Sequence, residues 1–142
     1  MLSRYRFTHE TEVRFRDLDA IGHVNNAVFL TYLEGARLAW WLHTTRRRGL
    51  AALDMILARA EIDYRSPLEW GESVVIGVGC LSIGRSSFVL GSDMHERASG
   101  RLVAECRKVL VSYDFAERRS RPIPDDVRAL LLEQDPDATT SR

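Results

Sequence analysis

The stretch AVFLTYLEGARLAWWL, residues 27–42, is apolar except at Thr31, Glu34 and Arg37. These three residues are spaced three apart, so on a helix they would form one narrow polar stripe on an otherwise apolar cylinder. A helix that is apolar nearly all round is either buried or spans a membrane, and the two charges within this one argue against lipid. The sequence therefore predicts a long central helix that the rest of the protein encloses.

Both ends of this helix carry recognisable signals. Asn25 or Asn26 can serve as the N-cap, because an Asn side chain accepts a hydrogen bond from a free amide of the first turn. The basic run at residues 46–48 followed by Gly49 is typical of a helix end. The same arginines could contact a coenzyme phosphate, but the electrostatics of a helix end already explain them.

Outside this helix, most of the chain alternates with the period of two that half-buried strands show. We predict strands over residues 11–16, 58–65, 73–83, 86–96 and 102–115, and a short helix over 125–134. The turns are tight, at residues 84–85 and 99–100, so neighbouring strands should be antiparallel. A curved antiparallel sheet wrapped around one apolar helix buries both, which makes the expected fold class α+β.

The last predicted strand contains an irregularity. Its apolar positions run 102, 104, 106 and then 109, 111, 113, 115, so the phase slips at Arg107 and Lys108. One extra residue is what a β-bulge inserts into a strand. We therefore expect a bulge at these two residues.

The composition excludes several classes of protein. A length of 142 residues fits one domain, which we place at residues 1–134 with a disordered tail at 135–142. The chain has 20 Lys and Arg residues and 20 Asp and Glu residues, so it lacks the excess of basic residues that is typical of a nucleic-acid binder. The two cysteines, Cys80 and Cys106, are expected to be reduced, and no Cys or His pair has zinc-ligand spacing. The sequence shows neither a signal peptide nor a membrane-spanning stretch, so we expect a cytoplasmic protein.

Candidate chemistry gathers just before the central helix, in the segment RDLDAIGHVNN at residues 16–26. A helix N-terminus offers unpaired amides and a partial positive charge, which can polarise a carbonyl or hold an oxyanion. A carboxylate a few residues earlier can activate water or attack directly. Asp and Asn are also common helix caps and His is often structural, so period and composition alone leave both readings open.

The segment D-L-D-A-I-G-H-V-N-N-A-V-F-L-T-Y-L-E-G-A-R resembles the signature of the hotdog-fold acyl-CoA thioesterases of the 4-hydroxybenzoyl-CoA thioesterase type. Its D-x-x-x-H-V-N-N part is also similar to plant acyl-acyl-carrier-protein thioesterases. Three later segments, E-I-D-Y-R-S-P-L-E-W-G-E, I-G-R-S-S-F and L-V-S-Y-D-F, are similar to further strand regions of the same family. The resemblance covers residues 8–130.

This resemblance implies a five-stranded antiparallel sheet around a central helix, with subunits that pair through their sheets and active sites at the subunit interface. The family's catalytic carboxylate corresponds to Asp19, as nucleophile or as general base toward water. The polarising backbone amide corresponds to Asn26, while His23 and Asn25 match the plant-type motif. His23 would orient the loop or a water, or take part in the chemistry. Some relatives carry Tyr or His at position 26, and plant-type members carry Asn where this chain has Ile21.

Other residues have weaker assignments. Related enzymes place coenzyme-A contacts at turns such as the one holding Arg85, Ser86 and Ser87, although these could equally be solvated turn residues. Glu34 and Arg37 are placed to form an ion pair on the helix, which is favoured over a catalytic use of Glu34.

The sequence thus predicts a thioesterase that hydrolyses an acyl-CoA to free acid and coenzyme A without a cofactor or metal. The alternatives are an acyl-acyl-carrier-protein thioesterase and a non-catalytic protein that binds acyl thioesters, because fold does not determine function. The expected partners are acyl-CoA and further copies of the chain, as a homodimer or dimer of dimers, with no nucleic acid. Pocket depth is expected to depend on five large side chains near the subunit interface: Phe29, Trp40, Trp41, Tyr64 and Leu68.

Overall fold

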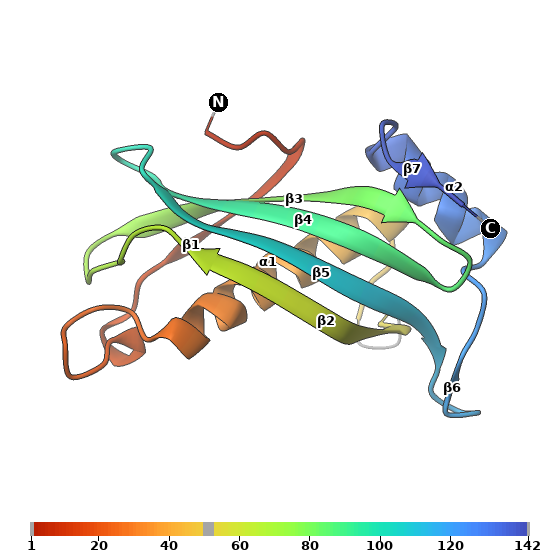
Figure 1. The fold of residues 1–142 in the computed structure, drawn as a ribbon, viewed down its shortest axis with the longest axis horizontal. Coiled ribbons are helices and arrows are strands. Elements are labelled where there is room, and N and C mark those ends of the chain that lie inside the picture. The colour runs from red at the N-terminus through yellow and green to blue at the C-terminus, as the bar shows by residue number, and fades with distance from the viewer. Residues whose placement is uncertain (1, 50–52, 142) are drawn as a thin grey trace.

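A computed structural model describes residues 2–49 and 53–141 and shows one curved sheet with a long helix against it (Figure 1). The five main strands are β1 (Phe7–Glu12), β2 (Met55–Tyr64), β3 (Ser73–Ile83), β4 (Ser87–Glu96) and β5 (Leu102–Asp114). They lie in the antiparallel order β1-β3-β4-β5-β2, and two-residue strands β6 (Arg119–Ser120) and β7 (Thr139–Thr140) pair with β5 and β3. The predicted α+β fold, with five antiparallel strands and a central helix, is confirmed.

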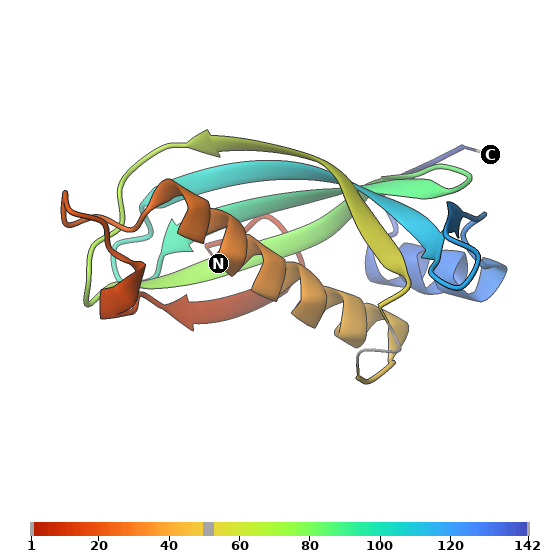
Figure 2. The ribbon, with the colours of Figure 1, turned by 90° about the horizontal axis from the view of Figure 1, so that it is seen from below.

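The central helix α1 (Asn26–Thr45) lies along one face of the sheet (Figure 2). Its buried residues, such as Leu33 and Trp40, join inward-facing residues of the strands in one hydrophobic core, and the Trp41 ring stacks on Phe88 at 5.7 Å between centroids. The helix ends at Arg46, which has a left-handed φ of 58°.

The predicted enclosure of α1 is only partly right. The strip of the helix that carries Leu30, Thr31 and Glu34 is exposed, whereas Arg37, predicted on the same polar stripe, is buried. The sheet covers only one side of the helix, so its opposite side is left uncovered within one chain.

The first strand lies four residues earlier than its predicted range. β1 ends at Glu12, and a 3-10 turn, η1 (Phe15–Asp17), follows. The Asp17 carboxylate accepts a hydrogen bond from the Arg14 backbone N–H at 3.0 Å, which curls the chain out of the sheet. As a result Phe15 is 71% exposed and does not share an inward face with Val13.

The predicted bulge at Arg107 and Lys108 is wrong. β5 keeps its alternation there, with Cys106, Lys108 and Leu110 all buried on the side that faces α1. The phase of the apolar pattern slips because an inward position is occupied by a lysine. The irregularity of β5 lies at Val103, where pairing with β4 skips one residue.

The C-terminal segment up to Ser141 lies against the helix and the sheet. Helix α2 (Asp125–Gln134) packs on α1 and buries Val127 and Leu131. The Asp135 carboxylate then accepts a hydrogen bond from the Cys80 backbone N–H at 2.8 Å, and β7 runs parallel to the end of β3. These backbone contacts join residues 135–141, the described part of the predicted tail, to the end of β3.

Candidate active site

A tight loop between η1 and α1 presents Asp19. The Asp19 backbone N–H donates to the His23 carbonyl at 2.9 Å, and the Gly22 N–H donates to the Asp19 carbonyl at 3.0 Å. Gly22 has a φ of +88°, a left-handed conformation that glycine adopts without steric cost. The Asp19 side chain accepts the Ile21 N–H at 2.9 Å, so its carboxylate is held in an Asx turn.

The neighbouring carboxylate, Asp17, has a different environment. It is buried, and it accepts hydrogen bonds from the Tyr32 hydroxyl and the Arg14 guanidinium. Burial by itself would raise the pKa of Asp17, but the bonds from Tyr32 and Arg14 outweigh it and hold that pKa below its ordinary value. Its backbone carbonyl also accepts the Asn25 N–H at 2.9 Å. Asp17 therefore anchors the loop to the helix and does not line the cleft.

The first turn of α1 leaves one amide available. Asn25 is the N-cap, because its side-chain oxygen accepts the Ala27 N–H at 2.9 Å and its carbonyl accepts the Val28 N–H at 2.9 Å. Within the described residues, the Asn26 N–H has no hydrogen-bond acceptor. The Tyr64 hydroxyl of β2 donates to the Asn26 carbonyl at 3.0 Å and ties the helix start to the sheet. A free amide at the positive end of a helix can hold an oxyanion.

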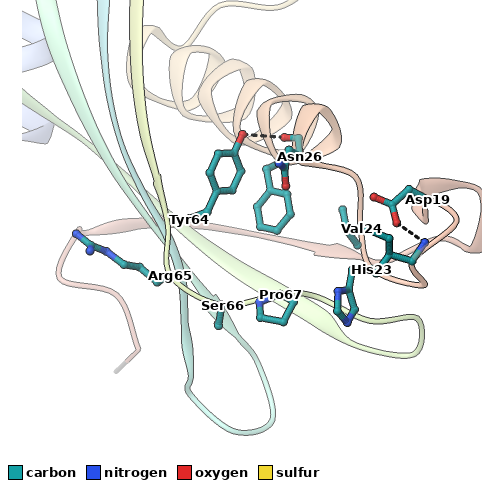
Figure 3. Close-up of a pocket in the computed structure, with 10 residues that line it drawn as sticks. Asp19, His23, Val24, Asn26, Tyr64, Arg65, Ser66 and Pro67 are labelled. Atoms are coloured by element: carbon teal, nitrogen blue, oxygen red, sulfur yellow. Dashed lines mark hydrogen bonds between the residues drawn. The ribbon is translucent and has the colours of Figure 1, made fainter.

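These elements surround a cleft of about 390 Å³ (Figure 3). The loop, the helix start and the end of β2 all contribute to its lining, which consists of Asp19, Ile21, His23, Val24, Asn26, Phe29, Tyr64, Arg65, Ser66 and Pro67. The structure therefore brings together Asp19, His23 and Asn26, the three residues predicted to be catalytic. Of the side chains expected to set pocket depth, Phe29 and Tyr64 line the cleft, whereas Trp40, Trp41 and Leu68 are in the core.

His23 lies at the edge of the cleft beside the β2–β3 loop. Its Nε2 is 3.8 Å from the Glu69 carboxylate, and both side chains are substantially exposed. The Val24 backbone N–H also donates to the Leu68 carbonyl at 2.9 Å, so the Asp19 loop and the β2–β3 loop are joined by the main chain.

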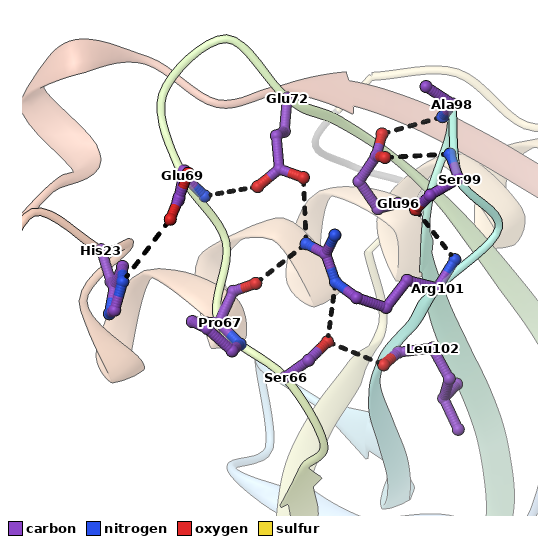
Figure 4. Close-up of polar contacts among 10 residues, drawn as sticks. All are labelled: His23, Ser66, Pro67, Glu69, Glu72, Glu96, Ala98, Ser99, Arg101 and Leu102. Carbon is purple, nitrogen blue, oxygen red and sulfur yellow. Dashed lines mark hydrogen bonds and ion pairs between the residues drawn. The ribbon is translucent and has the colours of Figure 1, made fainter.

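Arg101 holds the β2–β3 loop in place (Figure 4). Its guanidinium donates to the Ser66 hydroxyl at 3.1 Å, to the Pro67 carbonyl at 3.0 Å and to the Glu72 carboxylate at 2.9 Å. Glu72 in turn accepts the Glu69 N–H at 2.7 Å. Sequence patterns do not reveal Arg101 or the loop residues it supports, because contacts between residues so far apart in the chain leave no local signal.

The predicted coenzyme contacts lie elsewhere. Arg85, Ser86 and Ser87 form the β3–β4 turn, at the end of the sheet opposite the Asp19 loop (Figure 1). Their backbone carbonyls accept hydrogen bonds from Ile123, Ser112 and Gly84 respectively. Within one chain these three residues are therefore not part of the cleft, and Asn25 contributes to it only by capping the helix.

The family model of the thioesterase-like superfamily matches residues 13–131, which span the cleft and most of the main sheet. The chain belongs to this superfamily. The resemblance drawn from the sequence is thereby confirmed, together with the assignment to thioesterases. A comparison with curated proteins finds no match.

Solved thioesterase structures share this fold. A thioesterase from Thermus thermophilus, complexed with coenzyme A and Zn, is 33% identical with a TM-score of 0.79, over 91% of this chain and 94% of that one. A predicted thioesterase from Bacillus stearothermophilus is 30% identical with a TM-score of 0.83, over 90% and 95%. The 4-hydroxybenzoyl-CoA thioesterase from Pseudomonas sp. strain CBS-3 is 17% identical with a TM-score of 0.79, over 87% and 97%, and shares the hotdog fold.

Two features are absent from the described residues. Over residues 2–49 and 53–141, no three His, Cys, Asp or Glu side chains are grouped closely enough to hold a metal ion. In the same ranges, no helix has the length and apolar character that crossing a membrane requires.

Proposed function

We propose that this member of the thioesterase-like superfamily hydrolyses acyl-CoA to free acid and coenzyme A, with Asp19 and the Asn26 amide as the reacting centre. The observation that carries this proposal is the shared cleft, which is lined both by a carboxylate residue, Asp19, and by Asn26, whose amide has no acceptor within the described residues. Hydrolysis of a thioester needs both groups, one for the attack on the carbonyl carbon and one for its oxygen.

In this mechanism the thioester carbonyl oxygen accepts the Asn26 N–H, and the positive end of α1 stabilises the charge that develops on it. Asp19 either takes a proton from the attacking water or attacks the carbonyl carbon itself, forming an anhydride that water then opens. In both cases the C–S bond breaks and the thiolate leaves, to be protonated as the coenzyme thiol. His23, beside Glu69, orients the loop or the water.

Free-thiol release tests this proposal directly. Wild type and Asp19→Asn would be compared on short, medium, long and aromatic acyl-CoAs, and on the same acyl groups carried by acyl-carrier protein. We expect turnover of at least one CoA ester by wild type and a loss of about 10²–10⁴-fold in Asp19→Asn. Activity on the carrier protein alone would favour the carrier-protein thioesterase, and inactivity on both would favour a binding protein. Unchanged activity of Asp19→Asn would contradict the role of Asp19.

We also propose that the chain pairs with a second copy through β2. This ten-residue strand forms one edge of the sheet and exposes Ile56 and Leu57, each 43% exposed. A long apolar edge strand is a template for pairing with another chain. Arg85, Ser86 and Ser87 lie outside the cleft of their own chain, so in this proposal they would contact the coenzyme of another subunit, in a dimer or a dimer of dimers. The free thiols of Cys80 and Cys106 are compatible with the cytoplasmic location that we propose.

A further inference from the structure

Lys108 is the only lysine of the chain, and it is buried between α1 and the sheet. Its side chain is 4% exposed and faces the helix, between Cys106 and Leu110 on β5. Within the described residues no carboxylate forms an ion pair with its ammonium, and the groups that act on it electrostatically are Cys106, Arg37 and Glu34. A buried charge without a partner is costly, so this position calls for an explanation.

A second cation lies in the same layer. Arg37 of α1 is 9% exposed, its Nε atom has no partner within the described residues, and its charge acts directly on Lys108. Among the described residues, the carboxylate that acts on both is Glu34, which is 3.9 Å from the Arg37 guanidinium and mostly exposed to solvent. The layer between helix and sheet thus holds two positive charges, and the carboxylate that acts on both lies on the exposed strip of the helix.

Arg37 lies on the side of α1 that continues from the cleft, and its charge acts on Lys108 of β5. With 3.6 residues per turn, Asn26, Leu30 and Arg37 fall within about 40° of one another around the helix. Arg37 is eleven residues beyond Asn26, which corresponds to about 16 Å along the helix. The seam between α1 and β2, defined here by Leu30 on the helix and Ala60 and Tyr64 on the strand, therefore leads from the Asn26 amide to the two cations.

On the strand side, the seam runs over a similar distance from the cleft to Lys108. Tyr64 lines the cleft, and Ala60 pairs with Lys108 in the antiparallel ladder. These two β2 residues are four positions apart, or about 13 Å. Leu30, Ala60 and Tyr64 are all exposed within one chain, so the seam presents apolar walls without a covering element.

We propose that the seam holds the acyl group and that Lys108 and Arg37 bind an anionic oxygen, a carboxylate or a phenolate, at its far end. This inference rests on the proposed function, since it takes the thioester carbonyl to lie at the Asn26 amide. Apolar walls suit the methylene or ring carbons of such a group. The two cations supply the positive charge that pairs with its anionic terminus. A second chain paired along β2 would cover the seam from outside.

Binding of non-hydrolysable ligands tests the proposal without requiring turnover. S-alkyl-CoA thioethers, in which a methylene replaces the carbonyl, would be made in matched pairs with and without a terminal carboxylate, over lengths that span about 13–16 Å. A third series would carry a terminal phenol. Calorimetry on wild type, Lys108→Met, Lys108→Arg and Arg107→Met would give, for each protein, the ratio of the affinity for the ligand with the terminal group to the affinity for the matched ligand without it. Arg107 is the matched control because it is the exposed neighbour on the opposite face of β5.

We expect wild type to prefer the anionic ligand by about tenfold or more, as a charge-assisted hydrogen bond provides. Lys108→Met should bring this ratio to about one, while Lys108→Arg and Arg107→Met keep it. The carboxylate and phenol series identify which oxygen is bound. Equal affinity of wild type for charged and uncharged ligands at every length would overturn the proposal, as would a preference that survives in Lys108→Met. Failure of the proposed function would instead appear as an absence of thiol release, whatever these ratios are.

Discussion

The Asn26 backbone amide can be removed with little change to the rest of the site. Asn26 is the first residue of α1, a position where proline is well tolerated, and Asn25 has φ −59° and ψ 140°, the conformation that precedes proline. We expect Asn26→Pro to lower kcat about 10²–10³-fold, because it deletes the oxyanion donor, while Asn26→Ala keeps near wild-type activity. Steady-state thiol release with thermal unfolding checks both. Equal activity of the two variants would exclude the amide from catalysis.

Asp17 and Tyr32 give a second prediction at the same scale. The folded-state pKa of Asp17 lies below its ordinary value, so its contribution to stability is full above about pH 4 and is lost as the pH falls through the folded pKa. Tyr32→Phe removes a buried bond to this carboxylate and should cost about 1.5–3 kcal/mol at neutral pH. The difference from wild type should shrink in acid.

Urea denaturation at several pH values measures this difference. Tyr113→Phe, which alters a ring that packs on Phe115 near the end of β5, is the control. A cost of Tyr32→Phe that stays constant down to pH 2 would mean that the Asp17 charge does not contribute.

For the strand β5, burial of Lys108 has a consequence for stability. Burial lowers the pKa of Lys108, and the Arg37 charge lowers it further. In the unfolded chain Lys108 therefore binds its proton more tightly than in the folded one. The cost of its burial to the free energy of unfolding is full below the pKa of the folded state, and it is relieved as the pH rises through the pKa of the unfolded state. Lys108→Met should raise the free energy of unfolding by about 1–4 kcal/mol at neutral pH.

Chemical denaturation at pH 7 and at higher pH measures this gain, which should diminish with rising pH. Lys108→Arg retains the charge and should show no gain. A destabilised Lys108→Met would indicate that the ammonium has a stabilising partner.

At the scale of the whole molecule, the uncovered β2 edge predicts self-association. We expect wild type to sediment at twice the monomer mass or more, and the Ile56→Lys, Leu57→Lys double variant to shift toward the monomer, because lysines on an edge strand oppose pairing. Phe115→Lys is the matched control, since Phe115 is 56% exposed and lies outside β2. A monomeric wild type at micromolar concentration would contradict pairing through β2.

Much of this molecule follows from local sequence patterns. The apolar stretch with its Asn cap predicts α1, and the period-two alternation predicts β3 with the bounds that the structure shows. The D-x-x-x-H-V-N-N motif points to Asp19, His23 and Asn26, which the structure brings into one cleft. Such features are local because hydrogen-bonded turns and side-chain periodicity involve residues only a few positions apart.

Only the tertiary structure decided which of two nearby carboxylates is buried and which lines the cleft. The motif spacing points to Asp19, but the local sequence does not reveal that Asp17 is buried; Tyr32 of α1 reaches back to bond its carboxylate. Likewise, the inward position of Lys108 and the contact of β7 with β3 depend on pairing between distant strands. Burial is set by what the fold packs against a residue, and a residue's sequence neighbours do not specify that.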